Sequence, residues 1–318
     1  MLVPRDVQPK GAVLLCAGGA FSFRGDYTDT VPTAEELNKL GYQCFVVDYR
    51  LHPYTQEEGA LDLARAVRFV RKNADIYRIN PDNIVVAGFS AGGIQAGEQA
   101  MNFKGDINGT KLDSRYIPDD LDKISADVAA VGVIYSFYGR LSVAELDVDK
   151  LRNANLPPTY VCYGTNEVFR NQIERHITAL ENAGVTVGVN MLEGYSHGFG
   201  ANGNWCPDFD KFLLSVFSEE DTKPNITVDK PVIENGKIKF SINSDADLKN
   251  IYLITALYED KILQAVNVNE TNGEFSILPE KTYMVKIFVW ERNTLEPLMQ
   301  SFSFDNLKVD DKTMKFPV

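Results

Sequence analysis

Short apolar runs alternate with segments of helical periodicity over the first two thirds of the chain. Runs that are apolar at consecutive positions are typical of strands buried on both faces of a parallel sheet. They predict strands at 11–16, 42–49, 84–87, 128–136, 159–163 and 185–191. Apolar residues at helical spacing predict helices at 33–40, 56–73, 94–101, 171–182 and 208–217. This alternation predicts an α/β domain whose mostly parallel sheet is flanked by helices.

The pattern changes after residue 218. Residues 219–225 are charged and contain a proline, which is typical of a linker. Beyond it, short alternating runs predict strands at 237–242, 251–258, 262–268, 274–278, 283–290 and 299–304. The sequence therefore predicts an α/β domain at 1–218, a linker at 219–225 and a small all-β sandwich at 226–318.

Composition and charge narrow the classes of partner. Asp and Glu number 44 against 32 Lys and Arg, and the net charge of −12 disfavours a nucleic-acid partner. We find no apolar run long enough to span a membrane and no leader at the N-terminus. The compartment stays open: cytoplasmic as the sequence stands, secreted or at the cell surface if a leader has been removed. The four cysteines lack metal-like spacing, so we expect buried free thiols, no metal and no cofactor.

The strand at 84–87 leads directly into Gly88-Phe89-Ser90-Ala91-Gly92, and a helix is predicted immediately afterwards. A strand, a sharp turn at serine and a helix are what a nucleophile elbow requires. Gly88 and Gly92 are expected because side chains on either side of the serine would collide across the turn. Ser90 is therefore the candidate nucleophile.

A serine nucleophile needs a base and an acid that orients the base. Of the three histidines, His52 precedes a proline and lies before the serine, and His176 lies inside the helix predicted at 171–182. His197 follows the last predicted strand in a glycine-rich loop, which makes it the candidate base. The candidate acid is Glu167, in the loop after the strand at 159–163.

Two further carboxylates, Asp147 and Asp149, are reserves for the acid, although no predicted strand immediately precedes them. An oxyanion hole also needs backbone N–H groups aimed at the developing negative charge. We expect one from Ala91, the residue after the nucleophile, and others from the small-residue loop 18–21 after the first strand.

These motifs together resemble the α/β-hydrolase superfamily, in particular its small serine esterases of the acetyl-esterase, acetylxylan-esterase and feruloyl-esterase type. The resemblance covers residues 1–218 and is carried by the stretches Ala17-Gly18-Gly19-Ala20-Phe21, Asp48-Tyr49-Arg50-Leu51, Gly88-Phe89-Ser90-Ala91-Gly92-Gly93, Gly164-Thr165-Asn166-Glu167 and His197-Gly198-Phe199. It implies Ser90 as nucleophile, Glu167 as acid and His197 as base. It also implies Gly19, Ala20 and Ala91 as oxyanion donors.

The chain departs from the family pattern in three ways. Glu167 stands where the family usually has Asp. Ala17 and Ala20 replace a His (or Pro) and a third Gly, which narrows the pocket floor by a methyl group. The strands that normally precede the first one seen here are absent, which suggests a truncated chain or an exposed sheet edge.

The C-terminal segment is similar to fibronectin-like modules of bacterial surface and carbohydrate-active proteins, in the stretches 256–260 and 285–291. The resemblance implies contact with carbohydrate or the cell surface through this domain. Trp290 and Tyr258 are candidates for a sugar-stacking platform, although core packing is favoured for aromatic residues of alternating strands.

The favoured function is a serine carboxylesterase that hydrolyses small acyl esters, above all acetyl esters, on a small molecule or a carbohydrate. One alternative is a serine peptidase of the prolyl-oligopeptidase type, which would usually need a larger access-restricting domain. The other is a binding protein that keeps a non-catalytic hydrolase scaffold.

Overall fold

A computed structural model describes residues 1–221, 226–244, 251–268, 271–278, 281–291, 297 and 301–308. The chain divides into two compact units, Met1–Ser218 and Glu219–Val318. Residues 222–225 of the predicted linker lie outside the described residues, as do 299 and 300 of the strand predicted at 299–304.

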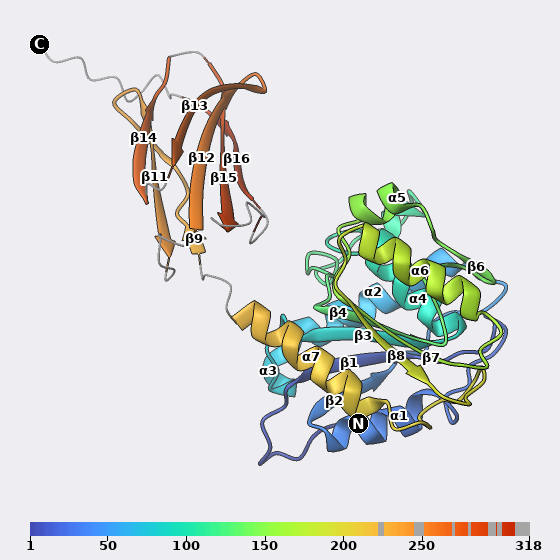
Figure 1. Cartoon of the computed structure of the whole chain (residues 1–318). Helices are drawn as coiled ribbons and strands as arrows, with labels where there is room; N and C mark the ends of the chain where they lie inside the picture. Colours follow the sequence, from blue (N-terminus) through green and yellow to red (C-terminus); the bar gives the residue numbers. More distant parts are fainter. Residues whose placement is uncertain are drawn as a thin grey trace, which may run out of the picture. The chain divides into compact units, whose positions relative to one another are not determined.

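The first unit is built on one six-stranded sheet whose neighbouring strands are all parallel (Figure 1). Its strands are β1 Gly11–Cys16, β2 Tyr42–Val46, β3 Ile84–Phe89, β4 Ala130–Ile134, β7 Thr159–Gly164 and β8 Val187–Leu192. They lie in the order β2-β1-β3-β4-β7-β8. The prediction of a mostly parallel sheet is confirmed. The strand predicted at 128–136 ends two residues early, because Tyr135 takes a positive φ of 40° that ends the extended backbone.

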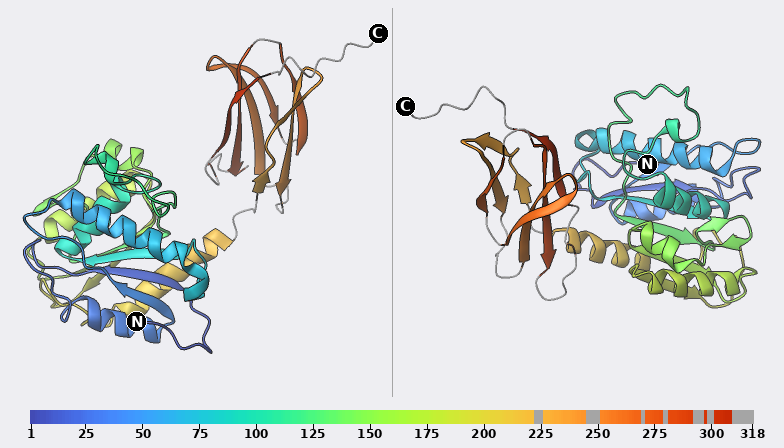
Figure 2. Two further views of the ribbon diagram at one scale, coloured as in Figure 1. Left: turned by 180° about the vertical axis from the view of Figure 1, so that it is seen from behind. Right: turned by 90° about the horizontal axis from the view of Figure 1, so that it is seen from above.

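Helices cover both faces of this sheet (Figure 2). They are α1 Thr30–Lys39, α2 Gln56–Lys72, α3 Ala74–Tyr77, α4 Ala91–Asn102, α5 Val148–Asn153, α6 Arg170–Asn182 and α7 Cys206–Asp221. α1 and α7 pack on one face, and α2, α4 and α6 pack on the other. The helix predicted at 208–217 runs on to Asp221, so the first three residues assigned to the linker are helical.

Side chains of each strand alternate between these two layers. In β1, Leu14 and Cys16 belong to the core beneath α2 and α4, whereas Val13 and Leu15 belong to the core beneath α1 and α7. All six residues of β1 are buried, which explains why the sequence shows a continuous apolar run there instead of an alternating one.

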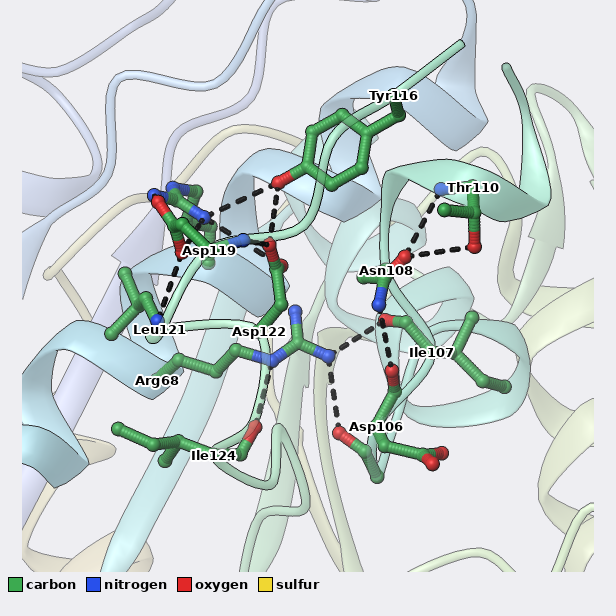
Figure 3. A network of polar contacts seen from close by, with 12 residues as sticks. Arg68, Asp106, Ile107, Asn108, Thr110, Tyr116, Asp119, Leu121, Asp122 and Ile124 are labelled. Carbon is green, nitrogen blue, oxygen red and sulfur yellow. Dashed lines mark hydrogen bonds and ion pairs between the residues drawn. The ribbon is translucent and has the colours of Figure 1, made fainter. Parts of the chain in front are cut away.

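The polar stretch between α4 and β4, predicted as a loop, is organised around a buried arginine of α2 (Figure 3). The Arg68 guanidinium donates to the carbonyl oxygens of Gly105, Ile107 and Ile124 at 2.7–3.1 Å. Nearby, the buried Asp122 carboxylate accepts hydrogen bonds from the Tyr116 hydroxyl and from a backbone N–H. The stretch carries only one short helical turn, η1 Gly109–Lys111, so these bonds satisfy backbone groups that regular structure leaves free.

The second unit is all-β, as predicted. Its strands are β9 Ile226–Val228, β10 Val232–Glu234, β11 Lys237–Ser244, β12 Ile251–Glu259, β13 Ile262–Val268, β14 Asn272–Ser276, β15 Tyr283–Glu291 and β16 Phe302–Leu307. One sheet holds β9, β10, β11 and β14, and the other has the order β13-β12-β15-β16. Ile238 and Phe240 of the first sheet share a core with Leu253 and Val285 of the second, which makes a sandwich.

Two aromatic residues of this sandwich lie elsewhere than expected. Leu257 and Val289 face the core, so their strand neighbours Tyr258 and Trp290 project from the opposite face of the sheet and are half-buried. The favoured prediction of core packing for these two side chains is therefore wrong. Trp290 pairs with Tyr252, which lies six residues along β12 from Tyr258, so the Cα atoms of the two aromatic residues are about 20 Å apart.

The cysteines are free and buried, which confirms that prediction. Burial raises the pKa of Cys44 and Cys206 to about 12, so these thiols stay protonated at neutral pH. None of the helices in the described part of the chain has the length and apolar character needed to cross a bilayer.

Candidate active site

Ser90 lies at the sharp turn between β3 and α4, with φ 49° and ψ −119°. This conformation is strained for a residue with a side chain and costs about 1–3 kcal/mol. The Ser90 N–H donates to the carbonyl oxygen of Ile134 in the neighbouring strand β4 at 3.0 Å. The turn therefore presents Ser90 at the carboxyl edge of the sheet, between β1 and β4.

Glycines on both sides allow this turn, but for different reasons. A Cβ on Gly88 would lie 2.1 Å from the carbonyl oxygen of Gly92, so Gly88 does avoid a collision across the turn. A Cβ on Gly92 would instead lie 2.0 Å from the carbonyl oxygen of Cys16 in β1. The predicted reason for Gly92 is therefore wrong, because the crowding comes from the neighbouring strand.

His197 reaches Ser90 from the loop after β8. Its Nε2 lies 2.9 Å from the Ser90 Oγ, across 107 residues of sequence. The rings of Tyr135 and Phe169 lie edge-on to the imidazole, at centroid distances of 4.9 and 5.7 Å. These contacts fix the orientation of a ring that is otherwise partly open to solvent.

Glu167 lies behind the imidazole, in the loop after β7. Both of its carboxylate oxygens are within 3.0 Å of the His197 Nδ1, and its side chain is 0% exposed. Because an ionised carboxylate only accepts hydrogen bonds, Nδ1 carries the proton and Nε2 is left to accept from Ser90. Oε1 also accepts from the Phe169 N–H at 3.0 Å.

The loops that carry Glu167 and His197 are hydrogen-bonded to each other. The Asn166 N–H donates to the Tyr195 carbonyl oxygen, and the Gly194 N–H donates to the Thr165 hydroxyl. Gly164 lies so close that an added Cβ would be 2.0 Å from the Tyr195 oxygen. The separation between Glu167 and His197 is therefore set by the backbone of both loops.

The loop after β1 turns through three consecutive positive φ values, 133° at Gly19, 49° at Ala20 and 60° at Phe21. The Gly19 carbonyl oxygen points into the loop's own turn, where it accepts from the N–H groups of Ser22 and Phe23. Within residues 1–221, the N–H groups of Gly19, Ala20 and Ala91 have no hydrogen-bond partner. Such free donors, one of them at the N-terminus of α4, are what an oxyanion hole presents.

The segment 48–51, which follows β2, contacts this loop through Tyr49. The Tyr49 hydroxyl donates to the carbonyl oxygen of Ala17 at 2.6 Å, and the Ala17 side chain is fully buried. Arg50 turns the other way and pairs with Asp62 of α2 at 2.9 Å. The alanine that replaces the family's His or Pro is thus a packing residue and does not line the pocket floor.

The sequence profile of the BD-FAE family matches residues 2–172, more than half of the 318 residues. The chain belongs to the BD-FAE family. The match includes Ser90 and Glu167 and ends before His197.

Curated relatives match this BD-FAE chain over part of its sequence. An acetylxylan esterase from Xylanibacter ruminicola is 35% identical over 86 residues, which is 27% of this chain and 18% of the relative. The matched parts cover between 15% and 20% of the curated relatives' own lengths.

Solved structures share the fold of the first unit. An acetyl ester-xyloside bifunctional hydrolase from Caldicellulosiruptor lactoaceticus is 22% identical, with a TM-score of 0.55 over 68% of this chain and 86% of that one. A thermophilic esterase from Thermogutta terrifontis, with propionate bound, is also 22% identical, with a TM-score of 0.51 over 70% and 88%. These similarities establish the α/β-hydrolase fold.

The other candidates are not part of the row from Ser90 to Glu167. The His52 side chain is exposed, although its backbone N–H donates to the Phe21 carbonyl oxygen at 2.8 Å. Asp147 caps α5 by accepting from two backbone N–H groups, and Asp149 pairs with Arg152 at 2.6 Å. Among the described residues, no cluster of His, Cys, Asp or Glu is arranged to hold a metal ion.

His176 is a structural residue of α6 and is 1% exposed. Its Nε2 accepts from the Tyr138 N–H at 3.2 Å, so its Nδ1 donates to the Glu145 carbonyl oxygen at 2.7 Å. Burial lowers the pKa of His176 to about 4, from 6.5 for a free imidazole. The neutral ring is therefore part of the folded core.

This pKa predicts a loss of stability in acid. Between pH 6.5 and 4 the unfolded chain binds the proton that folded His176 excludes, so the free energy of unfolding falls as the pH falls. The loss reaches about 3 kcal/mol by pH 4. In urea titrations at pH 7 and pH 4, we expect His176→Gln to remove this part of the pH dependence and His52→Gln to retain it. Equal pH dependence in both variants would contradict the role of His176.

Proposed function

We propose that this protein is a serine carboxylesterase that works by a Ser-His-Glu acyl-enzyme mechanism. The observation that carries the proposal is the continuous row from the Ser90 Oγ through the His197 imidazole to the buried Glu167 carboxylate, with each link at 2.9–3.0 Å. It stands at a strained strand-to-helix turn beside unpaired backbone N–H groups. The same arrangement performs acyl transfer on several unrelated folds.

In the first half-reaction, the Ser90 oxygen attacks the ester carbonyl carbon while His197 Nε2 takes the hydroxyl proton. The carbonyl oxygen becomes negative and is bound by N–H groups of Gly19, Ala20 and Ala91. The resulting imidazolium is stabilised by Glu167 and gives its proton to the departing alcohol oxygen. Water, deprotonated by His197, then attacks the acyl-serine, and the acid leaves as Ser90 regains its proton.

We further propose that the acyl group is small, with acetyl preferred, and that the alcohol is a carbohydrate. Support comes from the acetylxylan esterase among the relatives. The rings of Phe169 and Tyr135 also flank the imidazole closely, and Phe137 packs behind Phe169 at a ring distance of 6.2 Å. Crowding beside the base leaves less room for a long acyl chain.

An ester panel tests this substrate assignment. We expect kcat/KM for p-nitrophenyl acetate to exceed that for the octanoate by at least about tenfold, since each misfit methylene costs about 1 kcal/mol or more. Acetylated xylan should release acetate. A preference for octanoyl or feruloyl esters would contradict the acetyl assignment and leave the serine mechanism standing, whereas cleavage of aminoacyl-prolyl reporters alone would favour a peptidase.

A further inference from the structure

A buried aspartate beside the oxyanion loop has no place in the chemistry described so far. Asp29 directly precedes α1, yet its side chain makes no capping bond to that helix. Aspartate at this position ordinarily caps the first turn. Here the carboxylate, in a residue only 6% exposed, turns toward the catalytic loops.

Both carboxylate oxygens are engaged there. Oδ2 accepts from the Gly18 N–H at 2.9 Å, and Oδ1 accepts from the Tyr135 hydroxyl at 2.8 Å. Among the described residues, no Lys, Arg or His forms an ion pair with Asp29. A buried carboxylate without a cation is costly, so it is stabilised by these two hydrogen bonds and by a longer one from the Thr28 hydroxyl to Oδ1 at 3.4 Å.

Each of the two partners belongs to a different part of the site. Gly18 opens the oxyanion loop, and a Cβ there would lie 3.1 Å from the Ser90 Cβ. Tyr135 follows β4, and its ring lies edge-on to both His197 and Phe199 of the base loop. Burial and the charge of Asp29 raise the pKa of Tyr135, so its hydroxyl stays protonated and donates to Asp29. One carboxylate thus connects the oxyanion loop to the ring that supports the base.

We propose that Asp29 and Tyr135 are positioning residues. They hold the Gly19 and Ala20 N–H groups and the His197 imidazole at the distances and angles from Ser90 that the reaction needs. They touch no reacting atom and act only through Gly18 and His197. The inference rests on the proposed esterase function. Oxyanion donors bind the transition state more tightly than the substrate. Misplacement of these groups relative to Ser90 therefore lowers kcat and leaves KM nearly unchanged.

The test compares two conservative variants with matched controls. Asp29→Asn and Tyr135→Phe remove the charge and the hydroxyl with little change of shape. The controls Asp122→Asn and Tyr116→Phe remove the same kind of bond elsewhere, in which the buried Asp122 carboxylate accepts from the hydroxyl of the half-buried Tyr116 at 2.8 Å (Figure 3). For each variant, competent Ser90 is counted by complete titration with a fluorophosphonate, and kcat and KM for p-nitrophenyl acetate are measured per titrated site.

We expect kcat per titrated site to fall by about 10- to 100-fold in Asp29→Asn and Tyr135→Phe, with KM within about twofold of the parent. The two controls should keep the parental kcat. The inference would be overturned if kcat per titrated site in Tyr135→Phe and in folded Asp29→Asn equalled that of the controls. A pair with a purely structural role would lower only the thermal stability or the fraction of protein that is titrated. An inactive parent protein would instead overturn the proposed esterase function.

Discussion

Ser90→Ala is expected to lower kcat for p-nitrophenyl acetate by at least about 10⁴-fold, while the protein stays folded. In the proposed mechanism, alanine removes the atom that forms the acyl-enzyme, and the proposed oxyanion donors retain a small part of the acceleration. The elbow backbone should persist, because Ser90 is fixed by its N–H bond to Ile134 and by the packing of Gly92 against β1.

The matched control is Ser215→Ala on α7, whose exposed hydroxyl donates to the Phe212 carbonyl oxygen of the same helix. It should keep the parental rate. Ester hydrolysis by Ser90→Ala at more than about a tenth of the parental rate would show that another group is the nucleophile.

Glu167→Gln is expected to lower kcat by about 10³- to 10⁴-fold. An amide offers an N–H group to His197 Nδ1, and the imidazole then places its proton on Nε2, where it can no longer accept from Ser90. The side chain at position 167 is fully buried, so the amide has no contact with solvent that could replace its contact with Nδ1.

Glu167→Asp separates the effect of the negative charge from the effect of side-chain length. It restores a carboxylate that is one methylene shorter, and we expect a kcat between those of the parent and Glu167→Gln. Glu181→Gln, which changes an exposed carboxylate of α6, is the control and should leave kcat unchanged. A loss of less than about tenfold in Glu167→Gln would assign the orienting role to another residue.

Much of the fold was predictable because its strands are buried on both faces. A run such as Ala12-Val13-Leu14-Leu15-Cys16 has few other interpretations, and β1 begins and ends where the sequence predicts. The short elements were not predictable in the same way. α5 is stabilised by its Asp147 cap and by the contact of Leu151 with the core, and neither leaves a periodic pattern in six residues.

The candidate site shows a similar division. Ser90, His197 and Glu167 each follow a predicted strand, so the topology of a parallel sheet brings them to one edge. Asp29 and Tyr135 carry no such signal. Asp29 stands at the start of a helix, where a capping role is the ordinary expectation, and its engagement with Gly18 depends on how the chain turns between residues 18 and 29.

The backbone conformation of Ala20 also could not be predicted from the sequence. Sequence comparison predicts only that a methyl group replaces a hydrogen there. The positive φ of 49° shows that the residue occupies a backbone region in which alanine is less stable than glycine by about 1 kcal/mol. The loop is held in this conformation by its own hydrogen bonds and by the Tyr49 contact to Ala17.

The most direct test of the proposed mechanism is to trap the acyl-enzyme. The protein is mixed with p-nitrophenyl acetate, quenched in acid within the first turnover, digested and analysed by mass spectrometry. We expect one acetyl group on the peptide that contains Ser90, its accumulation in step with the p-nitrophenol burst, and its absence in Ser90→Ala. Hydrolysis without any adduct, or with the acetyl group on another residue, would contradict Ser90 as the nucleophile.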